Sequence, residues 1–398
     1  MVIKGQATVV KHTGSHYMLS ALPQWDLFPA VLRGKIRLKD SNATNPVAVG
    51  DVVDYEAEIP DEALDDVGVG GHSDVSGQGQ VWCDRLATHV NAENPAAITK
   101  VHKRRNYVIR KSTNLSRQSH IIAANLDRAF LVVTIDFPQV KLPFLDRLLV
   151  TCEVYNVPPV IVLNKCDLYG PEHEDMLAAF HEIYEGAGYP IIDVSARTGQ
   201  GIDLLRDVVS GKRLPDGSLD AAYDPAKPAV SLFSGVSGVG KSSLIKALDP
   251  SLEPRVGDIS TAHEQGRHTT TFYEMYRVQT GEQMFRSAQH DMDEPRHHES
   301  STCSPESGSC HPERSDGSVG FIVDTPGLRG FGLVDLKKEE IGLYFPEMLK
   351  ASEGCRFAPC THTHEPGCAV KEAVEDGIIS YDRYSSYLGM LDEEGKYR

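Results

Sequence analysis

The chain has 398 residues, of which 40% are hydrophobic and 24% are charged, and its formal net charge is −16 at pH 7. This length exceeds one ordinary hydrophobic core, so we expect two or three domains of a soluble globular protein. The first residues lack the apolar core of a signal peptide, and no run approaches the roughly 18 apolar residues of a membrane span. Together these features predict a cytoplasmic protein with no membrane partner.

The N-terminal region, residues 1 to about 57, contains short alternating strands at the spacing of a small β-barrel. Residues 58–97 are acidic and then rich in Gly and Ser, and we interpret them as an insertion in a barrel loop. A barrel followed by basic residues suits single-stranded or irregular RNA, although a barrel can equally bind protein or single-stranded DNA. The basic residues are Lys100, Lys103, Arg104, Arg105, Arg110, Lys111 and Arg117.

From about residue 125, apolar runs alternate with helical patterns. The runs near 129–135, 160–163, 190–194 and 229–233 are typical of buried parallel strands. Helical stretches near 143–156, 172–187 and 201–210 separate them. The alternation predicts a doubly wound α/β domain.

A polar segment at about 280–318 interrupts this pattern between two predicted strands. It has no apolar period, so we interpret it as an insertion between them. A metal site there is an alternative, but low sequence complexity explains the composition more simply. The residues that this site would use are Cys303, Cys310, His297, His298 and His311.

A phosphate-binding loop of the G-x-x-x-x-G-K-S type follows the apolar run at 229–233 and precedes a helical segment. Its glycines allow backbone N–H groups to surround phosphates, and the helix N-terminus adds partial positive charge. We expect Lys241 to reach the β- and γ-phosphates and Ser242 to bind Mg²⁺. The predicted nucleotide-binding residues of this loop are Gly235, Val236, Ser237, Gly238, Val239, Gly240, Lys241, Ser242 and Ser243.

A guanine-reading motif precedes the phosphate loop, where Asn164, Lys165 and Asp167 follow a buried strand. The Asp167 carboxylate can accept two hydrogen bonds from the N1–H and exocyclic amino groups of guanine. Adenine has no such donor pair, which disfavours an ATP-using enzyme. Ser195 and Ala196 follow another predicted strand, and their backbone can donate to guanine O6.

Switch elements are predicted on both sides of the polar segment. Asp324 follows a strand and is expected to hold Mg²⁺ through a water, while the N–H of Gly327 contacts the γ-phosphate. Thr269 and Thr270 lie where switch I is expected, and the pattern leaves open which of them completes the Mg²⁺ shell.

The residue that orients the attacking water is less obvious. Leu328 stands where many GTPases carry a glutamine, and leucine cannot hydrogen-bond water. His268 is the nearest candidate catalytic residue, because its pKa range suits such a role. The alternative is that it is an exposed loop histidine.

Near the C-terminus, three cysteines and a histidine lie within fourteen residues. Cys355, Cys360, His362 and Cys368 form a tetrahedral zinc-ligand set, and no position is left open for water, which indicates a structural site. His364 is an alternative nitrogen ligand. Free cysteines without a metal are the other interpretation.

The nucleotide motifs stand in circularly permuted order, with the guanine-reading motif first, the phosphate loop second and Asp324–Gly327 last. With the segments 110–117, 125–127 and 266–271 and the Cys/His cluster, the chain resembles the circularly permuted, ribosome small-subunit-dependent GTPases (RsgA, also called YjeQ). The resemblance implies an OB-fold barrel at 1–112, a permuted P-loop GTPase α/β domain at 113–335 and a mainly helical zinc-binding domain at 336–398.

The resemblance also implies the function. Members of this family assist late maturation of the small ribosomal subunit, which stimulates their GTP hydrolysis, and the residue matching His268 is the proposed catalytic one. We therefore expect GTP and GDP, the small subunit and its rRNA as partners, Mg²⁺ with GTP, one Zn²⁺ per chain and a monomer, with hydrolysis driving release. The alternative is a GTP-dependent RNA-binding scaffold or regulator whose hydrolysis is incidental.

Overall fold

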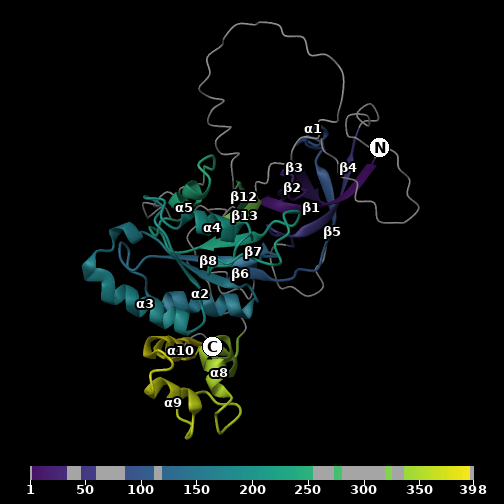
Figure 1. The fold of residues 1–398 in the computed structure, drawn as a ribbon. Coiled ribbons are helices and arrows are strands. Elements are labelled where there is room, and N and C mark those ends of the chain that lie inside the picture. Colours follow the sequence, from purple (N-terminus) through teal and green to yellow (C-terminus); the bar gives the residue numbers. More distant parts are fainter. Residues whose placement is uncertain are drawn as a thin grey trace, which may run out of the picture.

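The computed structural model describes residues 2–33, 46–59, 86–111, 119–253, 273–279, 319–324 and 336–394. Figure 1 shows a small β-barrel from the N-terminal part of the chain, an α/β domain from its middle and a helical domain near its C-terminus. The barrel and the helical domain lie on different sides of the α/β domain, so both outer parts are attached to the central one.

Five strands close the N-terminal barrel. They are hydrogen-bonded in the order β1-β2-β3-β5-β4, and β4 also pairs with β1. The β3–β5 pair is parallel and the others are antiparallel, as in the Greek-key barrel of an OB-fold. Inward-facing apolar side chains such as Val9, Leu19 and Ile98 form its core. The strands are β1 Val2–Thr13, β2 His16–Ser20, β3 Phe28–Leu32, β4 Val52–Glu58 and β5 Ala96–Val101.

The sequence patterns place the barrel strands within residues 1 to about 57, where only four of these strands lie. The missing one is β5, which falls where the expected insertion meets the basic stretch. Its buried residues are only Ala96 and Ile98 before Thr99 and Lys100 reach the surface, so its apolar signal is short. The short helix α1 (Leu86–His89) precedes it, and residues 60–85 of the insertion lie outside the described residues.

The central domain contains the expected parallel sheet. Its strands are hydrogen-bonded in the order β10-β9-β8-β11-β13-β12. All neighbours are parallel except β12, which is antiparallel to β13. The strands are β8 Arg128–Val133, β9 Pro159–Leu163, β10 Ile191–Asp193, β11 Val230–Ser234, β12 Tyr273–Gln279 and β13 Val319–Asp324.

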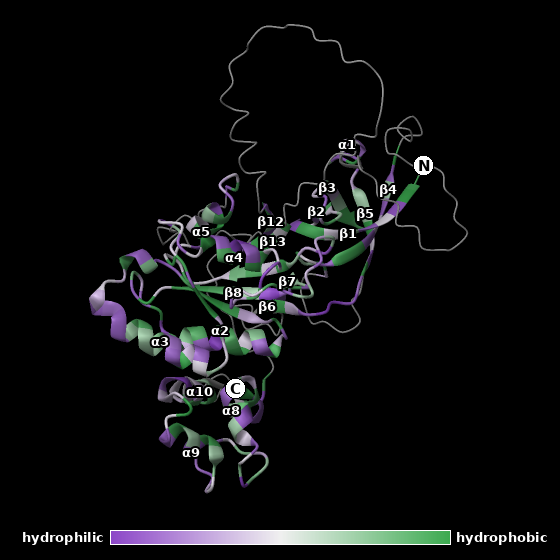
Figure 2. Cartoon of the chain, in the orientation of Figure 1, coloured by the Kyte–Doolittle hydropathy of each residue, from purple (hydrophilic) through white to green (hydrophobic). Residues whose placement is uncertain are grey.

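Helices cover both faces of this sheet (Figure 1). Leu131 of β8 packs in one core with Leu145 of α2, whereas the next residue, Val132, packs with Leu244 of α5 in the other. Because both faces are buried, the central strands are apolar along their length, as the green β8 in Figure 2 shows. The helices are α2 Leu142–Val154, α3 Glu174–Gly186, α4 Ile202–Val209 and α5 Lys241–Leu248, with short turns η2 Cys166–Leu168 and η3 Pro171–His173.

The barrel and the central sheet are continuous. Strand β1 pairs antiparallel with β12, where Lys11 lies opposite Glu274 and its Nζ donates to Glu274 Oε1 at 2.7 Å. A hairpin of β6 (Tyr107–Lys111) and β7 (Ser119–Ala124) also contacts the barrel through a bridge between Val49 and Ala123. Within the described ranges, the strands of the barrel and of the central sheet therefore form one 11-stranded sheet across two domains that the sequence indicates as separate.

The C-terminal domain is helical, as expected. Its core includes Phe345, Met348 and Tyr387, and Val150 of α2 belongs to the same cluster. Helix α10 packs along α2, so the domain docks on the face of the α/β domain that carries α2 and α3 (Figure 1). Its elements are α7 Lys338–Ile341, η4 Gly342–Tyr344, α8 Pro346–Ser352, α9 Ala369–Glu375 and α10 Tyr381–Glu394.

Over the ranges that the structure describes, none of the helices combines the length and the apolar composition that a membrane span requires.

Candidate nucleotide site and metal centre

The nucleotide motifs converge at one edge of the central sheet. Asn164 follows β9, Ser195 comes two residues after β10, Gly235 follows β11, and Asp324 is the last residue of β13. These strands are parallel, so their carboxyl ends meet at the edge where doubly wound folds bind ligands. The structure therefore brings together motifs that lie far apart in the chain.

The phosphate loop depends on glycine at two close approaches. A Cβ on Gly235 would lie 2.3 Å from the carbonyl oxygen of Val132 on β8. Gly240 has a φ of 92°, and a Cβ there would lie 2.5 Å from Nδ2 of Asn164. Only glycine avoids both the contact and the left-handed strain. These glycines let the loop pack against β8 and the guanine-reading motif while α5 directs its N-terminus toward the loop.

Lys241 and Asp324 supply opposite charges beside this loop. The Lys241 Nζ donates to the carbonyl oxygen of Gly235 at 2.8 Å, which holds the ammonium within the curve of the loop. Burial lowers the pKa of the Lys241 ammonium, and the nearby Asp324 carboxylate opposes that shift. Half-buried Ser242 follows at the start of α5. A cation, a hydroxyl and a carboxylate at one loop fit a magnesium–phosphate group, with Ser242 and Asp324 as the groups that can hold the metal.

Asn164 connects three loops. It is 1% exposed, and its Nδ2 donates to the carbonyl oxygen of Val239 at 2.8 Å. Its Oδ1 accepts from the backbone N–H of Ala196 at 3.2 Å. The neighbouring Lys165 donates through Nζ to the carbonyl oxygen of Gly238 at 2.7 Å. The phosphate loop, the guanine-reading motif and the Ser195–Ala196 turn thus form one hydrogen-bonded unit.

The turn that begins at Ser195 holds Asp167 in place. The Asp167 Oδ1 accepts from Oγ of Ser195 at 2.6 Å, and the same Oγ accepts from the N–H of Thr198 at 3.1 Å. Arg197 lies 3.8 Å from Oδ2 of Asp167 but its side chain is 80% exposed, so this ion pair contributes little. An oriented carboxylate beside a phosphate loop complements a base that presents two N–H donors.

Tyr169 is a further positioning residue of this site, which the sequence motifs do not mark. Its hydroxyl donates to the carbonyl oxygen of Asn164 at 2.8 Å and accepts from the N–H of Ile135 at 3.0 Å. Ile135 lies in the loop after β8, in which the Phe137 carbonyl accepts a hydrogen bond from Lys165. Burial raises the pKa of Tyr169 to about 12, so the hydroxyl keeps its proton at neutral pH. A tyrosine two residues after the motif is the only sequence signal of this role.

The switch residues are predictions from sequence alone. His268, Thr269, Thr270 and Gly327 lie outside the described residues, as do the cysteines and histidines at 297–311. Of the switch motifs, the structure describes Asp324 and the strand β12 that follows switch I.

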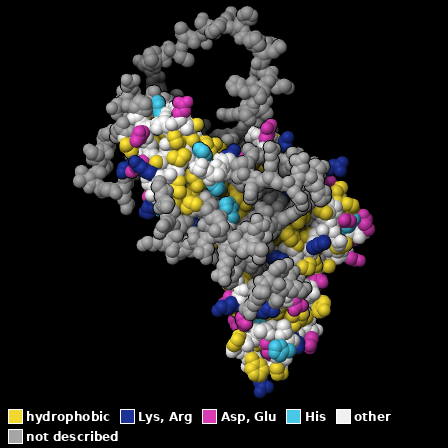
Figure 3. Space-filling model, turned by 180° about the vertical axis from the view of Figure 1, so that it is seen from behind, with side chains coloured by type: hydrophobic (Ala, Val, Ile, Leu, Met, Phe, Trp, Pro, Cys, Tyr) yellow, Lys and Arg dark blue, Asp and Glu magenta, His cyan; other side chains and the backbone are white. Residues whose placement is uncertain are grey.

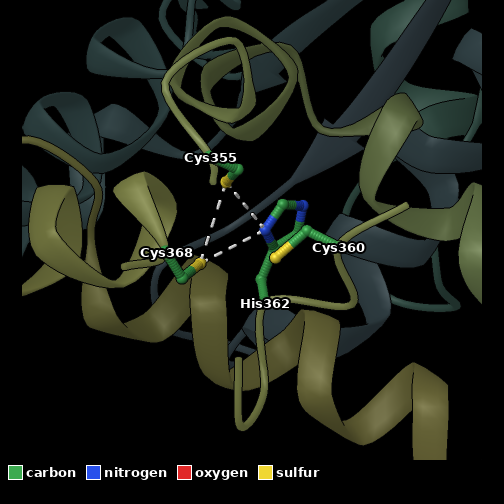
Figure 4. A group of neighbouring side chains, drawn as sticks. All are labelled: Cys355, Cys360, His362 and Cys368. Carbon is green, nitrogen blue, oxygen red and sulfur yellow. Dashed lines mark hydrogen bonds between the residues drawn. The ribbon is translucent and has the colours of Figure 1, made fainter. Parts of the chain in front are cut away.

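Three cysteines and a histidine converge in the C-terminal domain (Figure 4). One ligand atom from each of Cys355, Cys360, His362 and Cys368 lies within 4.8 Å of the others. His362 Nδ1 is 3.4 Å from Cys368 Sγ and 3.7 Å from Cys355 Sγ. A tetrahedral ion with metal–ligand distances of about 2.1–2.3 Å separates its ligand atoms by about 3.6 Å, so one metal ion fits this set. Within the described ranges, it is the only cluster of this kind.

The loop that carries His362 is held by Glu365. The Glu365 carboxylate accepts from the N–H of Thr361 at 2.8 Å and from the N–H of Thr363 at 3.0 Å. His364 is exposed, its Nδ1 lies 2.9 Å from Oγ1 of Thr363, and it is not a member of the cluster. Of the two histidines that the sequence leaves open, the structure therefore places His362 among the cysteines.

The basic stretch is partly neutralised where the structure describes it. Arg104 forms an ion pair of 2.6 Å with Asp51, whose side chain is fully buried, and Arg105 forms one of 2.7 Å with Asp127. Lys103 is exposed. On the face drawn in Figure 3, basic and acidic side chains are interspersed over the described residues. Arg104 thus has a structural role, and the described part of the stretch, residues 100–105, presents less positive charge than its sequence suggests.

Comparison with known proteins decides the family. A family model of the RsgA GTPase matches residues 101–214 and 218–286. The small ribosomal subunit biogenesis GTPase RsgA 2 of Bacteroides thetaiotaomicron is 39% identical over 392 residues, which cover 98% of each chain. This chain belongs to the RsgA GTPase family. The RsgA of Porphyromonas gingivalis is 38% identical over 390 residues, covering 98% of this chain and 97% of that protein.

Solved structures of similar proteins show the same fold. The crystal structure of YjeQ from Thermotoga maritima has a TM-score of 0.64 at 26% identity and covers 100% of both chains. YloQ, described as a circularly permuted GTPase, has a TM-score of 0.58 at 22% identity and covers 100% of this chain and 96% of its own. The family resemblance and the fold class that the sequence predicts are therefore confirmed.

Proposed function

We propose that this protein is a GTPase that binds the small ribosomal subunit, assists its late maturation and leaves it after GTP hydrolysis. The observation that carries the proposal is the single hydrogen-bonded unit in which Asn164 joins the phosphate loop to the guanine-reading motif. The relatives that cover almost the whole chain are named small ribosomal subunit biogenesis GTPases, which supports the same activity and partner.

In this proposal, GTP binds with its base against Asp167 and its phosphates in the loop from Gly235 to Ser242. Lys241 neutralises the β- and γ-phosphates, and Ser242 and Asp324 hold Mg²⁺. When bound, Mg²⁺ offsets phosphate charge. Guanine selectivity follows because a base without the N1–H and amino donors leaves the Asp167 carboxylate poorly paired.

Hydrolysis needs a water aligned with the γ-phosphate. Leu328 cannot orient it, so we assign this role to His268, whose ring can accept or donate a hydrogen bond. One of Thr269 and Thr270 completes the Mg²⁺ shell, and the N–H of Gly327 contacts the γ-phosphate. These assignments rest on the positions of the residues in the family motifs.

The barrel is attached close to the predicted switch I. Strand β12 begins at Tyr273, directly after that segment, and its first residues pair with β1 of the barrel. A change in switch I that depends on the γ-phosphate therefore acts on a strand shared with the barrel. This connection supports a nucleotide-dependent grip on the ribosomal subunit.

The metal of the C-terminal domain is zinc in this proposal, with one ion per chain. Three thiolates and an imidazole are a preferred zinc set, and the four protein ligands leave no position for water. The ion therefore stabilises the domain and takes no part in hydrolysis. We place the protein in the cytoplasm as a monomer, with domains at about 1–112, 113–335 and 336–398.

GTP turnover tests the proposal. The full chain is assayed alone, with small ribosomal subunits and with large subunits, and its co-sedimentation is measured with GDP and with a non-hydrolysable GTP analogue. We expect stimulation by small subunits only and tighter binding with the analogue. His268→Ala should bind GTP normally, turn over slowly and stay longer on the subunit. Equal turnover with and without subunits, together with nucleotide-independent binding, would instead indicate a scaffold with incidental hydrolysis.

A further inference from the structure

Helix α10 contacts the metal-binding loop with one part of its surface. The hydroxyl of Tyr384 donates to the carbonyl oxygen of His362 at 2.6 Å, and that of Tyr387 donates to the carbonyl oxygen of Thr361 at 2.7 Å. Both carbonyls belong to the loop that places His362 among the three cysteines. The position of this loop and the position of α10 are therefore linked by two direct hydrogen bonds.

Arg383, the residue before Tyr384 on α10, reaches the α/β domain. Arg383 is fully buried, and its guanidinium donates to Asp146 of α2 at 2.7 Å and to Glu347 of α8 at 2.8 Å. It also lies 4.6 Å from the centroid of the Phe345 ring. Burial alone would lower the pKa of Arg383, but the carboxylates of Asp146 and Glu347 hold it above its usual value. A buried charge of this kind needs both partners in place.

Apolar packing connects the same elements. Val150 of α2 belongs to the core cluster of the C-terminal domain, together with Tyr387 and Phe345. The ring of Tyr387 lies 6.3 Å from that of His362. One side chain, Tyr387, thus contacts the metal loop and packs in the core that α2 completes. Displacing Tyr387 therefore disturbs both the metal loop and the core of the C-terminal domain.

We infer that α10 couples metal binding at the Cys/His cluster to docking of the C-terminal domain on α2. The metal fixes the loop of Thr361 and His362, and the loop holds Tyr384 and Tyr387. The two tyrosines keep α10 where Arg383 reaches Asp146. Because coupling between two equilibria is reciprocal, loss of the Arg383 contact must also weaken metal binding. The inference rests on the zinc site of the proposed function, and neither GTP nor the ribosome takes part in it.

The first test removes the metal and follows the domain interface. The full chain is loaded with Zn²⁺, its zinc content is measured, and hydrogen exchange is compared before and after chelation. Couplings of this kind are commonly about 5–150-fold, so we expect exchange of α2 to become about tenfold faster. Helix α4 on the opposite face of the sheet should keep its rate. Unchanged exchange of α2 overturns the coupling alone, whereas a chain that binds no zinc overturns the zinc site as well.

The second test runs in the reverse direction. Zinc release to a chelating dye is timed for Arg383→Lys, Tyr387→Phe and the control Tyr381→Phe, whose tyrosine is on the same helix but 72% exposed. Lysine cannot replace the forked guanidinium, so we expect release at least about fivefold faster for Arg383→Lys. Tyr387→Phe keeps the ring and should also release zinc faster, while Tyr381→Phe should match the unmodified chain. Release at the unmodified rate from both Arg383→Lys and Tyr387→Phe overturns the inference.

Discussion

Replacing Gly240 by alanine should damage the nucleotide site before any nucleotide is present. The added Cβ would lie 2.5 Å from Nδ2 of Asn164, which donates to the Val239 carbonyl at 2.8 Å. Asn164 is buried and also accepts from Ala196, so it cannot move without breaking these hydrogen bonds. The substitution therefore separates the phosphate loop from the guanine-reading motif.

Two contributions add up to the expected loss of unfolding free energy in Gly240→Ala. A residue with a Cβ in left-handed backbone costs about 1–2 kcal/mol. Leaving a buried amide without its partner costs about 1–3 kcal/mol more. Gly238 provides a matched control, because its φ of 89° is close to the 92° of Gly240. A Cβ on Gly238 would lie 3.5 Å from Cδ of Pro138, an ordinary contact.

The assay is urea unfolding of both variants without nucleotide, followed by GDP titration. We expect Gly238→Ala to lose about 1–2 kcal/mol of unfolding free energy and Gly240→Ala about 2–5 kcal/mol. GDP affinity of Gly240→Ala should fall by about tenfold or more, since each 1.4 kcal/mol is a factor of ten. Equal stability losses in the two variants would refute the role of the Asn164 contact.

Three further substitutions test individual residues. Asp167→Asn should lose GTP affinity and gain affinity for xanthosine nucleotides, because xanthine presents an acceptor where guanine presents a donor; unchanged GTP binding in competition assays would contradict the guanine-reading role. Ser242→Ala should keep its fold by circular dichroism and lose Mg²⁺-dependent hydrolysis, and normal stimulated turnover would show that Ser242 does not bind the metal. Tyr169→Phe keeps the ring but removes hydrogen bonds to Asn164 and Ile135, so GDP should dissociate about tenfold faster. An unaltered dissociation rate would remove Tyr169 from the site.

The nucleotide and metal motifs can be recognised in the sequence because each motif lies within one short segment of the chain. A phosphate loop uses consecutive backbone N–H groups, so Gly235–Ser242 carries its full pattern in one segment. The cysteines and histidine of the metal cluster lie within fourteen residues, and the buried strands are continuous apolar runs. The permuted order of the motifs then predicts the family, which the comparisons confirm.

Contacts between distant segments have no such signature. Strand β1 pairs with β12 through backbone hydrogen bonds, and Lys11 and Glu274 are 263 residues apart. Backbone groups are the same in every residue, so no side-chain pattern indicates which edges meet. Strand β5 also has a weak signature, because only two of its side chains are buried and its apolar pattern is therefore short.

The environment of a charged residue is the feature that the sequence predicts least well. In the sequence, Arg104 belongs to a basic stretch and Arg383 to a polar helix, and both resemble solvent-exposed arginines. The fold instead pairs Arg104 with Asp51 and Arg383 with Asp146, which lies 237 residues away. Whether a charge faces water or a buried partner depends on which elements pack together. The sequence by itself predicts the chemistry of each motif and identifies the family, and only tertiary packing decides how the three domains are held together.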